Sequence, residues 1–165
     1  MKRTLRLVDR LQGAWQGWQV GYVASQNDAL TGLGSRNHFE RIGKYQIERR
    51  SKKMAVAVVT FDVSGFKFVN DNFGHHAGDI VLRILALCIR WCLRRETDAP
   101  FRFGGDEIVV FLSGADAQTA EDYGRRVQGA FLGVCYLVLH GLPSGFGLSF
   151  GVELMTRERA LESVL

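Results

Sequence analysis

The stretch "FRFGGDEIVVFL" (101–112) decides the fold, because two glycines and two carboxylates interrupt a run of bulky apolar residues. A glycine pair between two strand-like runs is typical of a β-hairpin with a tight turn. The stretch therefore predicts two adjacent antiparallel strands. A second interpretation stays open beside the first, in which the turn holds Asp106 and Glu107 next to a ligand that needs acids.

The composition indicates one soluble globular domain, with 165 residues, 47% hydrophobic and 23% charged. The net charge of +4 favours anionic ligands but is too small and too dispersed to indicate nucleic acid. The start "MKRTLRLVDR" lacks the apolar run of a secretory signal. Cys88, Cys92 and Cys135 lack zinc-ligand spacing, so we expect buried, reduced thiols and a cytoplasmic protein.

Strands alternate with helices along the chain, which predicts an α/β (α+β) domain built in layers. Residues 127–152 carry no Asp, Glu, Lys or Arg, but "HGLPSGFG" divides them, so we expect two buried elements and a turn rather than a membrane span. The expected helices are 36–50, 80–95, 116–132 and a helix beginning near 157, and the expected strands are 54–63, the pair within 101–112, and 147–154.

We expect residues 1–26 to form a segment separate from a domain over 27–165. An apolar stripe at three- and four-residue spacing predicts a helix over 4–25. This helix either packs on its own domain or pairs with a second chain and transmits a signal, and stripe spacing cannot separate the two.

Asp62 ends the buried strand "MAVAVVTFDV", where a lone carboxylate is costly unless a cationic group or a hydrogen-bond donor meets it. If this strand lies beside the hairpin, Asp62 and Asp106 converge at one edge of the sheet. Mg²⁺ binds through one or two carboxylates and completes its shell with water and substrate phosphates. Gly104 and Gly105, which lack a Cβ, would let a polyphosphate lie close to the backbone.

The segment "FKFVNDNFGHHAGD" (66–79) between these acids is rich in glycine and polar residues, and opens the helix that follows. Asn70, Asp71 and Asn72 suit ordinary turns and caps. An amide oxygen and a carboxylate can also accept hydrogen bonds from guanine N1 and N2. Asn70 and Asp79 are the candidates for that second role.

Four blocks together resemble the GGDEF family of diguanylate cyclases, in order and in spacing. They are "DALTGLGSRNHF", "FDVSGFKFVNDNFGHHAGDIVL", "FRFGGDEIVVFL" and "LSFGVE". The resemblance implies a cyclase-like fold with a central, mainly antiparallel sheet surrounded by helices. It also implies that a homodimer condenses two GTP into cyclic di-GMP and pyrophosphate, with Mg²⁺ or Mn²⁺.

The resemblance also implies roles for individual residues. Asp62, Asp106 and the Val63 carbonyl look like metal ligands, and Glu107 like an acid that binds metal or activates the 3′-hydroxyl. Asn70 and Asp79 look like guanine contacts, with His75 in the same segment, and Lys67, Gly65 and Phe66 resemble the phosphate-side loop. "RETD" (95–98) resembles the site where the family binds its product, with Arg95 and Asp98 as ligands and Arg126 as a further contact.

The sequence departs from the family pattern at three places. Ile108 replaces a phenylalanine in the signature, and Ser64 stands where a second acid is usual. The chain stops at "ALESVL", where the family continues into a helix with phosphate-binding lysine and arginine. The missing cations and Ser64 keep open a second hypothesis, a weakly active or inactive module that binds GTP or cyclic di-GMP. The N-terminal stripe keeps open a third, a dimerisation or signalling scaffold.

Overall fold

The computed structural model describes residues 26–51 and 54–155. The predicted helices at 4–25 and near 157 therefore lie outside the described residues. The elements, in chain order, are β1 (Gly34–Ser35), α2 (Arg36–His38), a π-helical turn η1 (Phe39–Gly43), α3 (Lys44–Ser51), β2 (Val56–Ser64), α4 (Phe66–Phe73), α5 (His75–Cys92), β3 (Ala99–Gly104), β4 (Glu107–Ser113), α6 (Ala117–Val138) and β5 (Gly147–Met155).

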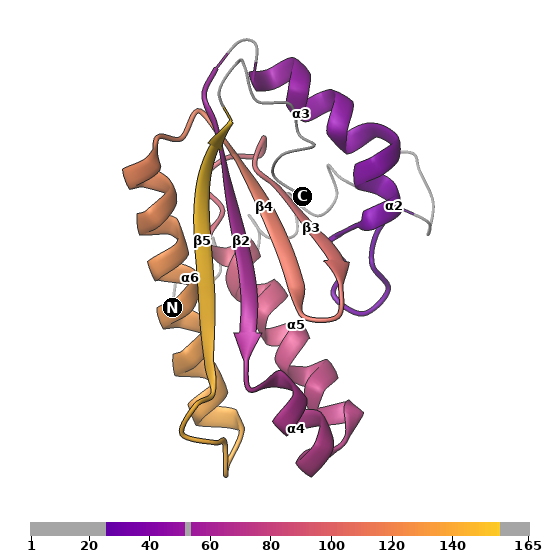
Figure 1. Ribbon diagram of the computed structural model, residues 1–165, viewed down its shortest axis with the longest axis vertical. Helices are drawn as coiled ribbons and strands as arrows, with labels where there is room; N and C mark the ends of the chain where they lie inside the picture. The colour runs from indigo at the N-terminus through magenta and orange to yellow at the C-terminus, as the bar shows by residue number, and fades with distance from the viewer. Residues whose placement is uncertain (1–25, 52–53, 156–165) are drawn as a thin grey trace, which may run out of the picture.

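The strands form one five-stranded sheet in the order β1-β3-β4-β2-β5 (Figure 1). Short β1 runs parallel to β3, and every other pair is antiparallel. The predicted α+β class with a mainly antiparallel sheet is therefore confirmed. The hairpin is also confirmed, because β3 and β4 pair from Ala99↔Phe111 to Gly104↔Glu107.

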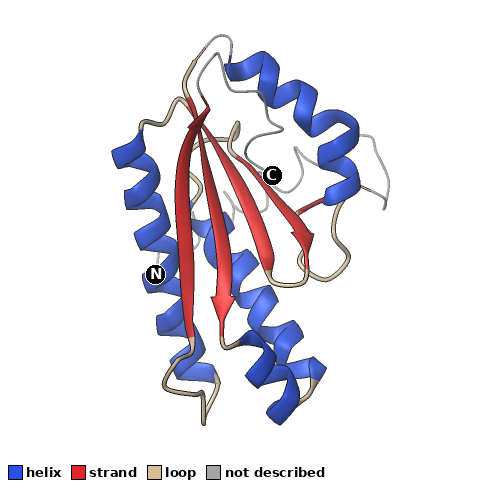
Figure 2. Cartoon of the chain, viewed as in Figure 1, coloured by secondary structure: helices blue, strands red, loops and turns tan. Residues whose placement is uncertain are grey.

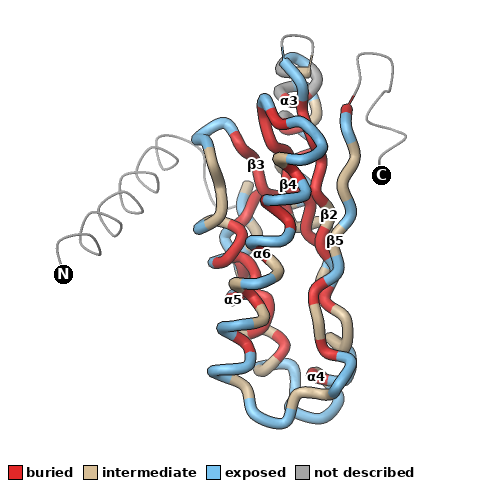
Figure 3. The backbone as a smooth tube through the Cα atoms, turned by 90° about the vertical axis from the view of Figure 1, so that its left-hand side faces the viewer, coloured by how far each residue is buried: buried red, intermediate tan, exposed pale blue. Residues whose placement is uncertain are grey.

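Helices α5 and α6 cover one face of the sheet, and the α2–η1–α3 segment covers part of the other (Figure 2). The α5/α6 side holds the larger core, which includes Val59, Phe61, Ile108, Tyr123 and Phe131. The second core joins Phe39 and Ile47 to the sheet residues Val58, Phe101 and Phe111. Figure 3 shows the buried residues gathered along the central strands, while the end near α4 is largely exposed.

The structure changes several predicted boundaries. The segment 66–73, expected as a polar lead into a helix, is itself helix α4, because Phe66, Val69 and Phe73 fall at helical spacing and Val69 is buried. Helix α6 continues to Val138, six residues beyond its predicted end at 132. Cys92 is half-buried rather than buried, whereas Cys88 and Cys135 are buried as expected.

Within the described residues, no helix combines the length and the apolar character needed to cross a bilayer. The uncharged region 127–152 instead forms the end of α6, a turn and most of β5. This arrangement confirms the two elements and the turn that the sequence predicts.

Burial also bears on the cysteines. It raises the pKa of the Cys88 thiol to about 11 and that of Cys135 to about 12, so both stay protonated near neutral pH. Their place in the apolar core accords with a packing role.

Gly124 of α6 provides a test of how this helix packs on β5. A Cβ at this buried position would lie 2.9 Å from Phe150 Cζ and closer still to two other ring carbons. We therefore expect Gly124→Ala to lower the free energy of unfolding by about 1–3 kcal/mol through overpacking. Urea denaturation followed by circular dichroism measures the change.

Gly129→Ala is the matched control on the same helix, because a Cβ at that exposed position meets nothing within 4 Å. This variant should be stabilised by up to about 1 kcal/mol through helix propensity. Equal stabilisation of both variants would contradict the close α6–β5 contact.

Candidate functional site

The outer face of β2 changes from apolar to polar along its length. Val56 and Val58 belong to the core under α3. Thr60 is half-buried, and Asp62 two residues later is exposed. The expectation that Asp62 is buried is therefore wrong: its neighbours Phe61 and Val63 point into the α5/α6 core instead. An exposed carboxylate needs no buried cation to offset its desolvation.

The end of β2 lies beside the glycine turn. Phe61 pairs with Ile108 across β2 and β4, so Asp62 and Glu107 are the next residues at the same end of the paired strands. Gly105 and Asp106 connect the strands, and Asp106 is half-buried. The predicted proximity of the Asp62 strand to the GGDE hairpin is thus confirmed at the level of strand pairing.

The conformation of the turn is held by Arg102. Gly105 has a φ of 48°, in the left-handed region that favours glycine. Arg102 donates from Nε at 3.0 Å and from Nη2 at 2.7 Å to the Gly105 carbonyl. Its Nη1 also donates to Asp28 Oδ1 at 3.0 Å. One guanidinium therefore joins the signature turn to a loop 74 residues earlier.

Asp28 is held by more than Arg102. Its Oδ1 accepts from Thr31 N at 2.9 Å and from Thr31 Oγ1 at 2.6 Å. Burial raises the pKa of Asp28, but the hydrogen bonds from Thr31 and Arg102 outweigh burial and hold the pKa below its ordinary value. The carboxylate therefore stays ionised as the partner of Arg102.

An open depression lies beside the turn, between the hairpin and the loop that contains Asp28. Its lining residues are Asp28, Ser35, Arg36, Asn37, Arg102, Phe103, Gly104 and Gly105. Gly104 and Gly105 are exposed, and a Cβ at either would meet nothing within 4 Å. The backbone of the turn is therefore open to a bulky ligand.

A second group of predicted residues lies around α4 and the start of α5. Gly65 precedes α4 with a φ of 80°, and Lys67 on the first turn is exposed. Asn70 and Asp79 are half-buried, on α4 and α5 respectively, while His75 at the start of α5 is exposed. Asn70 packs against Gly78, the residue before Asp79. The structure thus brings together the backbone positions of the predicted guanine contacts.

The residues resembling a product site behave differently from one another. Arg95 and Arg126 are exposed, whereas Asp98 is only 1% exposed. Asp98 Oδ2 accepts from the backbone N–H groups of Arg94 and Arg95, both at 3.1 Å. Its Oδ1 accepts from Ser113 N at 3.0 Å. The Asp98 carboxylate is therefore engaged in holding the loop before β3 against the end of β4.

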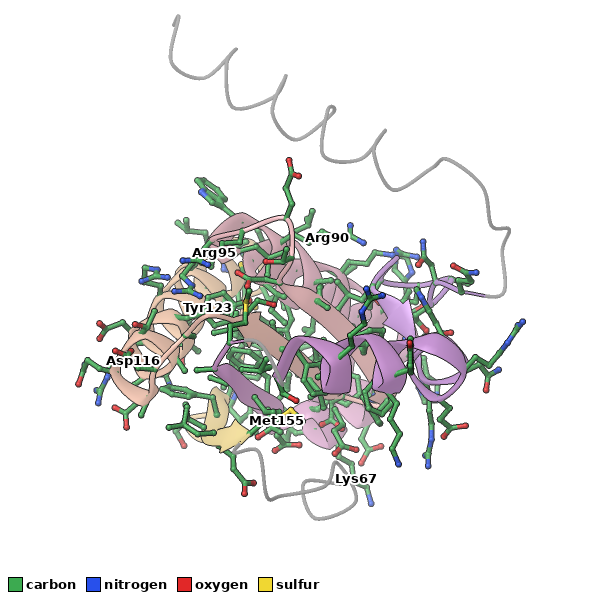
Figure 4. The ribbon with its side chains drawn as sticks, turned by 90° about the horizontal axis from the view of Figure 1, so that it is seen from above. Lys67, Arg90, Arg95, Asp116, Tyr123 and Met155 are labelled. Atoms are coloured by element: carbon green, nitrogen blue, oxygen red, sulfur yellow. The ribbon has the colours of Figure 1, made fainter. Side chains whose placement is uncertain are left out.

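Figure 4 shows Lys67 and Arg95 on opposite sides of the molecule. The predicted phosphate-side loop and the predicted product site are therefore separate regions of the surface. A ligand at one would not contact the other on the same chain.

The carboxylates near the hairpin suit a metal ion that binds together with its substrate. The part of the chain that the structure describes holds no cluster of three or more His, Cys, Asp or Glu side chains able to bind a metal ion. Asp62 and Asp106 supply two carboxylates near the hairpin. Mg²⁺ commonly binds through one or two carboxylates together with substrate phosphates, so these residues fit it.

Sequence reasoning missed Arg102, Asp28 and Gly78 as residues that shape the site. Asp28 lies in the first family-like block, and Arg102 stands two residues before Gly104. The only available signal was their place inside recognised blocks. Nothing in the local sequence reveals that the side chains of Arg102 and Asp28 meet.

Comparison with known proteins identifies the family. Residues 25–165 match the family described as "Diguanylate cyclase, GGDEF domain". Diguanylate cyclase DgcS of Shewanella oneidensis is 41% identical over 109 residues, which cover 66% of this chain and 36% of that protein. Diguanylate cyclase DgcP of Pseudomonas aeruginosa is 33% identical over 138 residues, covering 83% of this chain and 20% of that protein.

Solved structures of GGDEF proteins have the same fold as this chain. Diguanylate cyclase SiaD of Pseudomonas aeruginosa, solved in complex with its activator SiaC, aligns with a TM-score of 0.71 at 27% identity, covering 99% of this chain and 63% of that one. The coiled coil and GGDEF domain of DgcB from Caulobacter crescentus, solved with c-di-GMP, aligns with a TM-score of 0.70 at 19% identity. The alignment covers 99% of this chain and 83% of that one.

The chain therefore belongs to the GGDEF diguanylate cyclase family, whose activity is the synthesis of cyclic di-GMP. It spans roughly a third or less of the length of the curated relatives above, 36% and 20%.

Asp98 allows a test of its role in holding the loop. We expect Asp98→Ala to lower the free energy of unfolding by about 3 kcal/mol or more, because each buried N–H left without an acceptor costs about 1–3 kcal/mol. Urea denaturation at neutral pH measures the loss. Glu96→Ala, at an exposed position in the same loop, is the matched control and should stay within about 0.5 kcal/mol of the parent. Similar stabilities for the two variants would contradict the role.

Proposed function

We propose that this chain is a diguanylate cyclase domain that condenses two GTP into cyclic di-GMP with release of pyrophosphate. The observation that carries the proposal is the pairing of Phe61 with Ile108, which puts Asp62 at the same end of the sheet as the glycine turn and its acids. Family membership supports the substrate and the product.

In the proposed reaction, the 3′-oxygen of one GTP attacks the α-phosphorus of the other. A new P–O bond forms, the α–β phosphoanhydride breaks, pyrophosphate leaves, and the hydroxyl proton is released. Repeating the step in the opposite sense closes the ring. Because one chain has one set of candidate residues, we propose that two chains meet face to face as a homodimer, each holding one GTP.

Separate parts of the site hold separate parts of GTP in this proposal. Asn70 and Asp79 accept hydrogen bonds from the guanine edge, with His75 at the rim. Lys67 and the backbone at Gly65 and Phe66 face the phosphates. Gly104 and Gly105 leave room for the phosphates beside the hairpin, as their open surroundings allow.

Asp62, Asp106 and the Val63 carbonyl are the residues that would hold Mg²⁺ or Mn²⁺ near the α-phosphate. A divalent cation there would polarise the phosphoryl group and lower the pKa of the attacking hydroxyl. Asp106 stands in a turn fixed by Arg102, so its position is set before the substrate binds. In this proposal the exposed Glu107 accepts the hydroxyl proton or joins the metal ligands.

Ser64 supports a second candidate function, a module that binds GTP or cyclic di-GMP with little turnover. The Ser64 hydroxyl lies 3.2 Å from the Ser149 hydroxyl, near Asp62. An acid in place of Ser64 would add negative charge there. Fewer carboxylates would hold the metal more weakly. Nucleotide binding without product would favour this candidate.

The decisive experiment incubates the chain with GTP and Mg²⁺ and detects cyclic di-GMP by chromatography. Asp106→Asn should lower the rate at least a hundredfold, because a metal ligand is removed from the reacting phosphate. Asp122→Asn is the matched control, since Asp122 is an exposed residue of α6 that accepts a surface hydrogen bond from Gln118. Equal rates for the two variants would overturn the proposed role of Asp106, and GTP binding without product from the parent chain would favour the module.

Product inhibition forms a further part of the proposal, with Arg95 and Arg126 as exposed cations for the phosphates of cyclic di-GMP. Because Asp98 is only 1% exposed and already accepts from three backbone N–H groups, we assign the contacts with the ligand phosphates to the two exposed arginines. Arg95→Ala should weaken cyclic di-GMP binding about tenfold or more and leave GTP binding unchanged in calorimetry. Arg83→Ala, at an exposed position of α5, is the control. Equal loss of both ligands in Arg95→Ala would remove the site.

A further inference from the structure

Gly78 of α5 lies directly under the side-chain amide of Asn70. A Cβ built at Gly78 would overlap the Asn70 amide oxygen, and would lie 3.0 Å from Asn70 Cγ and 3.3 Å from Phe66 Cζ. Real Cβ atoms rarely approach other atoms this closely, so any side chain at position 78 must displace Asn70, and Phe66 must also adjust.

The approach follows from how α4 and α5 are joined. Gly74 links the two helices with a φ of 82°. Its N–H donates to the Asn70 carbonyl at 3.0 Å, and its own carbonyl accepts from Gly78 N at 3.4 Å. Asn70 is therefore four residues before the corner and Gly78 four residues after it, and the two positions face each other where the helices are close.

The backbone of Gly78 does not itself need glycine. Gly78 is absent from the positive-φ glycines and lies within α5. A glycine inside a helix costs about 1 kcal/mol relative to alanine. The feature that requires glycine here is the space that the Asn70 amide occupies.

Resting on the proposed function, we infer that Gly78 is a positioning and specificity-determining residue for guanine. It lets the Asn70 amide lie against the α5 backbone beside Asp79, so that amide and carboxylate are held together for a purine that carries both N1–H and a 2-amino group. A methyl group at position 78 displaces the amide while leaving the Asp79 carboxylate on its own helix.

The inference differs from simple helix packing in what it predicts for nucleotide choice. Inosine triphosphate lacks the 2-amino group of GTP but keeps N1–H. If Gly78 acts through Asn70, Gly78→Ala should reduce the preference for GTP over inosine triphosphate. If Gly78 only packs helices, the loss should fall equally on both nucleotides.

The test is a double-mutant cycle with the parent chain, Gly78→Ala, Asn70→Ala and the double variant. Calorimetry with Mg²⁺ measures binding of GTP, inosine triphosphate and ATP. We expect Gly78→Ala to weaken GTP binding about tenfold, to weaken inosine triphosphate binding less, and to add no more than about twofold once Asn70 is already alanine. Gly129→Ala, a helical glycine with open surroundings, should bind as the parent does.

Thermal denaturation of the same four proteins keeps the test valid if Gly78→Ala folds poorly. Removing the Asn70 amide should relieve the overlap, so Gly78→Ala should lower the Tm less in the Asn70→Ala background than in the parent. Equal losses in both backgrounds would overturn the inference.

Two other outcomes are decisive. If the parent chain prefers GTP, and Gly78→Ala keeps the same preference for GTP over inosine triphosphate, the inference is overturned and the proposed function stands. A parent chain that binds GTP no more tightly than ATP overturns both.

Discussion

The change of environment along β2 is the constraint on which the rest of the structure depends. This strand is hydrogen-bonded to β4 on one side and β5 on the other, and helices α5 and α6 cover one of its faces throughout. Its other face is covered by α3 at Val56 and Val58 and uncovered at Asp62. This interior strand is thus buried on both faces at one end and exposes Asp62 at the other, which gives an exposed acid a rigid support.

Much of the fold could be predicted because its signals are local. The glycine pair at 104–105 between apolar runs predicts the hairpin, and the run of valines before Asp62 predicts a strand buried on both faces. Helix α4 escaped prediction because Asn70, Asp71 and Asn72 favour turns by themselves, whereas burial of Val69 favours the helix. Tertiary packing overrode local preference there.

The candidate site could be predicted only in part, for a related reason. Residue types such as Asp62, Asp106, Asn70 and Asp79 can be read from recognised blocks, since each block has a fixed order. The contacts that position them cannot, because Arg102 meets Asp28 across 74 residues and the Asn70 amide meets the bare backbone of Gly78. The burial of Asp98 was likewise invisible in a four-residue pattern, which suggested a ligand contact and not an acceptor for three backbone donors.

Asp98 has a consequence for how such sequences are sorted. Losing this carboxylate would leave three backbone N–H groups without their acceptor, whether or not the Arg-x-x-Asp pattern also binds product. A search for the Arg-x-x-Asp pattern therefore finds sequences in which the aspartate supports folding as well as sequences in which the pattern serves product inhibition. The Arg95 side chain is exposed, and it is the backbone N–H of this residue that donates to the Asp98 carboxylate. The residue type at the first position of the pattern is therefore a better indicator of product inhibition than the aspartate is.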